Sequence, residues 1–75
     1  MKTDLLKIGQ LARIVGVLPS TINFYTNEKL LKAVGRSPGG YRLYEAKYAI
    51  SQIKLIQKLQ KDKRLRIEEI RAVLK

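Results

Sequence analysis

Residues 8–27 read IGQLARIVGVLPSTINFYTN and carry two helix signals separated by a short corner. The first signal is an apolar face at the spacing i, i+3, i+4 and i+7, formed by Ile8, Leu11, Ala12 and Val15. Gly16 follows directly, and glycine commonly ends a helix because it adopts a positive φ at little cost. Pro19 suits the first turn of the next helix, since its missing N–H would have no partner there. We therefore predict helices over residues 8–15 and 19–27, joined as in a helix-turn-helix, although many all-α proteins contain such a corner.

Turn-forming residues crowd into the segment that follows, namely Gly35, Pro38, Gly39 and Gly40. Their density excludes a helix and marks a turn. The flanking residues 32–34 and 41–44 are short and partly β-favouring, which predicts a small two-stranded hairpin. In this interpretation Gly39 and Gly40 supply the positive-φ positions of the turn.

A long segment without Gly or Pro follows the hairpin and predicts a helix over residues 45–61. Its apolar positions are Ala49, Ile50, Ile53, Ile56 and Leu59. The charged residues 61–64 interrupt it, and a short last helix is marked by Ile67, Ile70 and Leu74. Glu68 and Glu69 fall in its first turn, where the helix dipole favours acidic side chains. The sequence thus predicts a single, mainly α domain of four helices and a two-stranded β-hairpin.

Composition narrows the class of function. The chain has 75 residues, and its 16 Lys and Arg against 6 Asp and Glu give a formal net charge of +10, an excess that usually indicates a polyanionic partner. It contains no Cys and no His, so thiolate zinc sites, Cys nucleophiles and His general bases are excluded. No apolar run approaches the roughly 18 residues of a membrane span. We expect a cytoplasmic binding module without a cofactor or metal, not an enzyme.

One face of the helix over residues 19–27 is a candidate for reading DNA bases. Ser20, Asn23, Phe24 and Asn27 share one stripe at i, i+3, i+4 and i+7, while Ile22 is the expected core anchor. Asn can bond adenine bidentately, Ser can bond bases or phosphates, and Phe can pack on a thymine methyl. The alternative is that Phe24 belongs to the core and the polar residues form a solvated face. Spacing alone does not separate the two interpretations.

Basic residues form three further candidate contacts. Arg36 and Arg42 flank the hairpin tip, and Tyr41 sits beside Arg42. The two arginines could follow the phosphate backbone, enter the minor groove or be solvated charges of a plain turn. On the helix over residues 45–61, a basic row at i, i+4 and i+7 is either a phosphate contact or an ordinary solvated face, and it comprises Lys54, Lys58 and Lys61. A denser cluster forms either a backbone clamp or a charged corner, and it comprises Lys61, Lys63, Arg64 and Arg66.

The order of these segments resembles the N-terminal DNA-binding domain of the MerR family of bacterial transcription regulators. The motifs that carry the resemblance are Ile8-Gly9-Gln10-Leu11-Ala12, Gly16-Val17, Thr21-Ile22-Asn23-Phe24-Tyr25, Leu30-Leu31, Arg36, Gly40-Tyr41-Arg42-Leu43-Tyr44 and Ile67-Glu68-Glu69-Ile70. The most specific of them is residues 40–44, placed just downstream of a helix-turn-helix. The chain departs from the family at residues 23–26, where Asn-Phe-Tyr-Thr stands in place of the common Arg-Tyr-Tyr-Glu.

The resemblance implies a winged helix-turn-helix across residues 1–75, with the helix-turn-helix at about 8–28, the wing at about 32–44 and the last two helices at about 45–74. It implies that the second helix enters the major groove of double-stranded DNA and that the hairpin lies on the backbone. The implied contacts are Ser20, Thr21, Asn23, Phe24 and Tyr25 on the helix, and Arg36, Tyr41 and Arg42 on the wing. Family members pair as homodimers through a helix that would follow the last helix seen here.

Two other functions use the same features. An excisionase-like or architectural protein has the same small winged-helix body and bends DNA for recombination. An RNA-binding or anionic-membrane peptide would use the positive charge, but it leaves the order of helix, turn, helix and wing unexplained. We therefore expect sequence-specific DNA binding by a transcription regulator, with the DNA-bending protein as the alternative.

Overall fold

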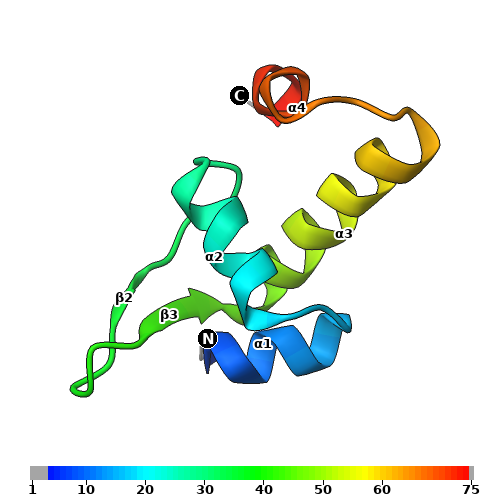
Figure 1. The fold of residues 1–75 in the computed structure, drawn as a ribbon. Helices are drawn as coiled ribbons and strands as arrows, with labels where there is room; N and C mark the ends of the chain where they lie inside the picture. The colour runs from blue at the N-terminus through cyan, green and yellow to red at the C-terminus, as the bar shows by residue number, and fades with distance from the viewer. Residues whose placement is uncertain (1–3, 75) are drawn as a thin grey trace.

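The computed structural model describes residues 4–74, which form four helices and a small antiparallel sheet (Figure 1). The helix-turn-helix consists of α1 (Ile8–Val15) and α2 (Pro19–Asn27). α1 ends at Gly16, whose φ of 75° lets its N–H donate to the carbonyl of Ala12. α2 begins with Pro19, after a Leu18 that makes no side-chain cap hydrogen bond.

The sheet has three strands in the order β1-β3-β2, made of β1 (Leu5–Lys7), β2 (Gly35–Arg36) and β3 (Arg42–Glu45). The predicted hairpin is the β2–β3 pair, in which Arg36 lies opposite Arg42. β1 is an additional strand that the sequence analysis did not predict, and it pairs Leu6 with Tyr44. Three residues are too few to show an alternating pattern, and the partner strand lies almost forty residues away. We call the β2–β3 hairpin with its connecting loop the wing.

The turn at the wing tip differs from the prediction at one glycine. The Gly40 N–H donates to the carbonyl of Ser37 at 2.9 Å, so Pro38 and Gly39 occupy the centre of the turn. Gly40 has a φ of 87°, whereas Gly39 lies outside the positive-φ region. The prediction of positive φ was therefore wrong for Gly39, because the left-handed residue follows this turn and is not at its centre.

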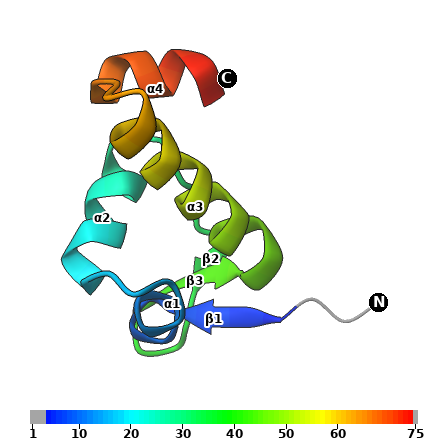
Figure 2. The ribbon, with the colours of Figure 1, turned by 90° about the vertical axis from the view of Figure 1, so that its right-hand side faces the viewer.

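Two further helices complete the fold, α3 (Ala46–Asp62) and α4 (Ile67–Leu74). The Glu45 carboxylate caps α3 by accepting from the N–H groups of Lys47 and Tyr48 at 2.9 and 2.8 Å. α3 runs from the sheet to the end of the molecule that carries α4 (Figures 1 and 2). At that end, Arg71 of α4 donates to the carbonyl and the carboxylate of Glu28, which ties α4 to the end of α2.

A single apolar core holds the helices and β3 together. The buried stripe of α3 supplies Ala49, Ile53, Ile56 and Leu59. The other buried members are Leu11, Ala12, Ile22, Tyr25, Leu30, Leu31, Tyr44 and Ile70. α2 is thus fixed by one face, which leaves its opposite face to solvent. Among residues 4–74, no helix combines the length and the apolar character needed to cross a membrane.

The end of α2 contains a strained residue. The Leu30 N–H donates to the carbonyl of Tyr25 and the Lys29 N–H to that of Thr26, which is the hydrogen-bond pattern of a Schellman motif. This motif requires a left-handed residue, and Lys29 has a φ of 64°. A side chain with a Cβ is unfavourable in that conformation by about 1–2 kcal/mol.

Replacing Lys29 with Gly is expected to raise the free energy of unfolding by about 1 kcal/mol, because the relieved strain exceeds the added flexibility of the unfolded chain. For a domain of this size the melting temperature should rise by roughly 4–8 °C in a thermal melt. Lys29→Ala is the matched control, since it removes the same charge but keeps the Cβ. An equal gain in both variants would assign the effect to charge repulsion and contradict the strain.

Candidate nucleic-acid interface

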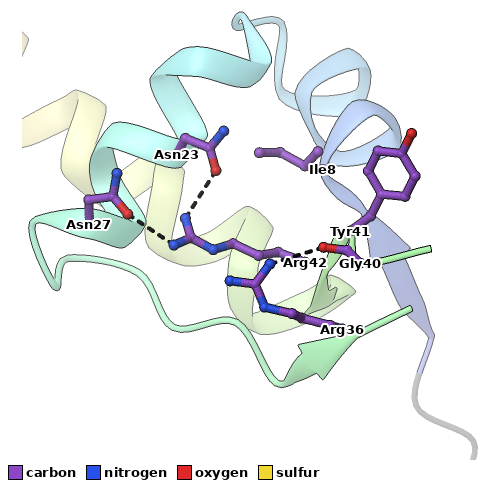
Figure 3. Close-up of a pocket in the computed structure, with 7 residues that line it drawn as sticks. All are labelled: Ile8, Asn23, Asn27, Arg36, Gly40, Tyr41 and Arg42. Carbon is purple, nitrogen blue, oxygen red and sulfur yellow. Dashed lines mark hydrogen bonds between the residues drawn. The ribbon is translucent and has the colours of Figure 1, made fainter. Parts of the chain in front are cut away.

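A cleft opens between α2 and the wing (Figure 3). Its lining residues come from α1, α2 and the wing, and they are Ile8, Asn23, Asn27, Arg36, Gly40, Tyr41 and Arg42. We call this feature the wing cleft. It brings together Asn23 and Asn27 from the exposed stripe of α2 with the three predicted contact residues of the wing, Arg36, Tyr41 and Arg42.

Arg42 connects the wing to α2 across this cleft. Its Nη1 donates to Asn23 Oδ1 at 3.0 Å, and its Nη2 donates to Asn27 Oδ1 at 3.0 Å (Figure 3). The two Asn residues lie one helical turn apart, so the planar guanidinium spans both amides with one fork. Arg42 is half-buried and both Asn side chains are exposed, so these charge-assisted bonds lie at the surface of the cleft.

The remaining basic groups near the cleft are exposed. Arg36 donates from Nη1 to the Gly40 carbonyl at 2.9 Å and so closes the wing tip on itself. A neighbouring hollow is lined by Lys7, Arg13 and Tyr41, among others, and the Lys7 Nζ lies 6.0 Å from the centre of the Tyr41 ring. We call Lys7, Arg13 and Arg36 the flanking cations. They give this side of the molecule a positive rim.

The other predicted residues of α2 divide between surface and core. Ser20 is exposed and Phe24 is 45% exposed, so Phe24 is not a core residue. Thr21 is half-buried. Tyr25 is 4% exposed, since one step beyond Phe24 turns the side chain by about 100° towards the core.

Two tyrosine hydroxyls bind α2 to its neighbours. Tyr25 donates to Gln60 Oε1 at 3.1 Å, and burial raises the pKa of its hydroxyl above the ordinary value. Thr26 Oγ1 donates to the Ile22 carbonyl, which leaves the Tyr44 hydroxyl to donate to Thr26 Oγ1 at 2.8 Å. Tyr25 and Thr26 therefore position α2 and offer no surface to a ligand of the wing cleft.

The basic row on α3 does not join the cleft. Lys54, Lys58 and Lys61 are all exposed on the helix face opposite the buried stripe. Ile22 and Tyr25 of α2 share the buried cluster with that stripe, and Tyr25 contacts Gln60 of α3. The lysines therefore lie on the side of α3 that faces away from α2. The cluster at the α3–α4 corner is also exposed and comprises Lys61, Lys63, Arg64 and Arg66.

The sequence analysis missed the contact of Arg42 with both Asn residues and the approach of α1 to the wing. The visible signal was the i, i+4 spacing of Asn23 and Asn27, which places two amides on one face. No pattern in the neighbouring sequence indicates that a wing residue fifteen to nineteen positions away donates hydrogen bonds to these amides. In residues 4–74 there is no cluster of His, Cys, Asp or Glu that could hold a metal ion.

The fold and the cleft define a winged helix-turn-helix protein, with the wing beside the exposed face of the second helix. The family model described as "MerR HTH family regulatory protein" matches residues 6–75. The chain belongs to this family.

Individual proteins are similar to this chain in sequence or in fold. The HTH-type transcriptional regulator ZntR of Escherichia coli (strain K12) is 40% identical over 38 residues, which are 51% of this chain and 27% of ZntR. A second match is the crystal structure of HiNmlR, a MerR family regulator that lacks the sensor domain and is bound to promoter DNA. The TM-score is 0.77 and the sequences are 27% identical, and the match covers 95% of this chain and 55% of the HiNmlR chain. A MerR family transcriptional regulator from Bacillus cereus shares the fold, with a TM-score of 0.67 and 23% identity over 95% of this chain and 52% of that one. This chain spans about a quarter of ZntR and about half of the two solved chains.

Proposed function

We propose that this chain binds double-stranded DNA with sequence preference, as the DNA-binding domain of a transcription regulator. In this proposal α2 enters the major groove and the wing lies against the sugar–phosphate backbone. The observation that carries it is the wing cleft, because the exposed amides of α2 and the tip of the wing face the same space. The net charge of +10 and the promoter DNA bound to HiNmlR support a nucleic-acid ligand.

The proposed contacts follow from exposure. On α2 the reading residues are Asn23, Asn27 and Phe24, while Ser20 and Thr21 lie near the helix start, where phosphates bind well. On the wing, Arg36 and Tyr41 contact the backbone, and Lys7 and Arg13 contact it beside the wing. Tyr25 is left out because it is buried. The row of Lys54, Lys58 and Lys61 is left out because it lies on the far side of α3.

Family membership favours a regulator over the DNA-bending alternative. We further propose that a longer form pairs as a homodimer, as the family resemblance implies, and that it acts in the cytoplasm where bacterial DNA is located. A single copy should then bind weakly, since it lacks the gain in effective concentration that a tethered second copy provides.

Chemical-shift mapping tests the proposed interface. We expect titration with a duplex recovered from a randomised pool to move the amide signals of residues 20–27 and 36–42. Signals along the exposed face of α3 should stay in place and serve as the internal control. If the α3 face responds while α2 and the wing do not, the proposed interface is wrong.

A further inference from the structure

The hydrogen-bonding chemistry of Arg42 fixes the orientation of the side-chain amides of Asn23 and Asn27. A guanidinium carries donors and no acceptor, so each Asn must turn its carbonyl oxygen towards it. The usual ambiguity between amide oxygen and nitrogen is therefore settled at Asn23 and Asn27. Both Nδ2 atoms point away from Arg42 (Figure 3). Among the hydrogen bonds within residues 4–74, neither Nδ2 donates to a protein acceptor.

This orientation changes what the amides can recognise. A free Asn donates and accepts side by side, which matches N7 and the N6 amino group of adenine. At Asn23 and Asn27 the acceptor is already engaged by a cation. The positive charge beside the oxygen also repels amino groups such as adenine N6 and cytosine N4. Guanine fits this arrangement better, because its O6 and N7 are two adjacent acceptors in the major groove.

We propose that Arg42 is a positioning residue for base selection: it holds Asn23 and Asn27 as hydrogen-bond donors, so that α2 selects guanine over adenine where they contact the duplex. The inference rests on the proposed function. It gives Arg42 a role that the sequence analysis did not, since there the residue was considered for the phosphate backbone, for the minor groove or as a solvated charge. It also departs from the general pairing of Asn with adenine that the sequence analysis considered for this stripe.

Selection from a randomised duplex pool, with the wild type and four variants, tests this role. Asn23→Ala identifies the base pair that Asn23 reads, because the preference there should disappear. The wild type should prefer guanine at that position. Arg42→Met frees the Asn oxygens, and the preference should move from guanine towards adenine by about tenfold. Arg36→Met is the matched control: it removes an arginine from the same wing and should lower affinity for all sequences alike without moving the preference.

Asn23→Asp provides a test that keeps the Arg42 contact. One carboxylate oxygen still accepts from Arg42, while the outward donor becomes an acceptor. The preference at the same base pair should then move from guanine to cytosine, whose N4 amino group donates. Because this variant retains the link between α2 and the wing, it shows whether the outward group of residue 23 reads the base. If Arg42→Met does not fold, the wild-type preference decides the matter, since an amide that is not held as a donor should prefer adenine.

The outcomes separate this inference from the proposed function. If the wild type prefers adenine at the Asn23 position, or if a folded Arg42→Met keeps the preference for guanine, the positioning role is wrong and DNA binding stands. If the wild type recovers no preferred sequence and duplex DNA leaves α2 unperturbed in the shift mapping, both the function and the role fail.

Discussion

Replacing Ile22 with Ala is expected to lower the free energy of unfolding by about 2–5 kcal/mol. Ile22 is completely buried, and it is one of the two buried residues, with Tyr25, that hold α2 on the core. A chain of this length has a total stability of about 4–11 kcal/mol, so the loss would remove a large part of it. Urea denaturation followed by circular dichroism measures the change.

Ile14→Ala is the control for this prediction. It removes the same atoms from a neighbouring helix, but Ile14 is 56% exposed. Its effect should stay within about 0.5 kcal/mol. If the two variants lose equal stability, the effect reflects helix propensity and the core does not position α2. DNA binding should be compared in both variants below their melting temperatures.

Local signals were sufficient to predict the helices. The bounds predicted for α1 and α2 are those observed, and α3 is displaced by one residue at each end. Apolar periodicity, Gly16 and Pro19 act within a few residues, so a sequence displays them directly. β1 could not be found in this way, because its pairing with β3 depends on contacts between residues 5–7 and 43–45.

In the candidate site, too, the features set by local spacing could be predicted and those set by tertiary contacts could not. Helical spacing placed Asn23, Phe24 and Asn27 on one stripe but did not decide whether Phe24 is a core residue, and the structure leaves all three exposed. Spacing did not show that Tyr25 is core or that the lysine row faces away from α2, since both depend on where α3 packs. The role of Arg42 depends on the wing folding back onto α2, a tertiary contact without a local signature.

Duplex DNA binding is expected to weaken about 40-fold when the salt concentration rises from about 50 to about 200 mM. The reason is that the flanking cations Lys7, Arg13 and Arg36 neutralise phosphates, and the DNA then releases its condensed counterions. These three side chains are exposed around the wing cleft and its neighbouring hollow. Three phosphate contacts correspond to a slope of about −2.7 in a plot of log affinity against log salt. Arg42 is not counted, because both of its Nη groups are bound to Asn23 and Asn27, whereas Arg36 uses only Nη1 at the Gly40 carbonyl. Fluorescence anisotropy with a labelled duplex measures the slope.

Two triple variants with equal loss of charge test which face provides that slope. Exchanging Lys7, Arg13 and Arg36 for Gln removes the flanking cations, and the slope should approach zero because no counted phosphate contact is left. Exchanging Lys54, Lys58 and Lys61 for Gln removes three charges from the far side of α3 and should leave the slope near that of the wild type. Both variants lose the same net charge. A difference between their salt slopes therefore reports where on the surface the DNA binds, and not the overall attraction between protein and DNA. If the α3 variant instead loses most of the slope, DNA lies along α3 and the wing cleft is not the interface.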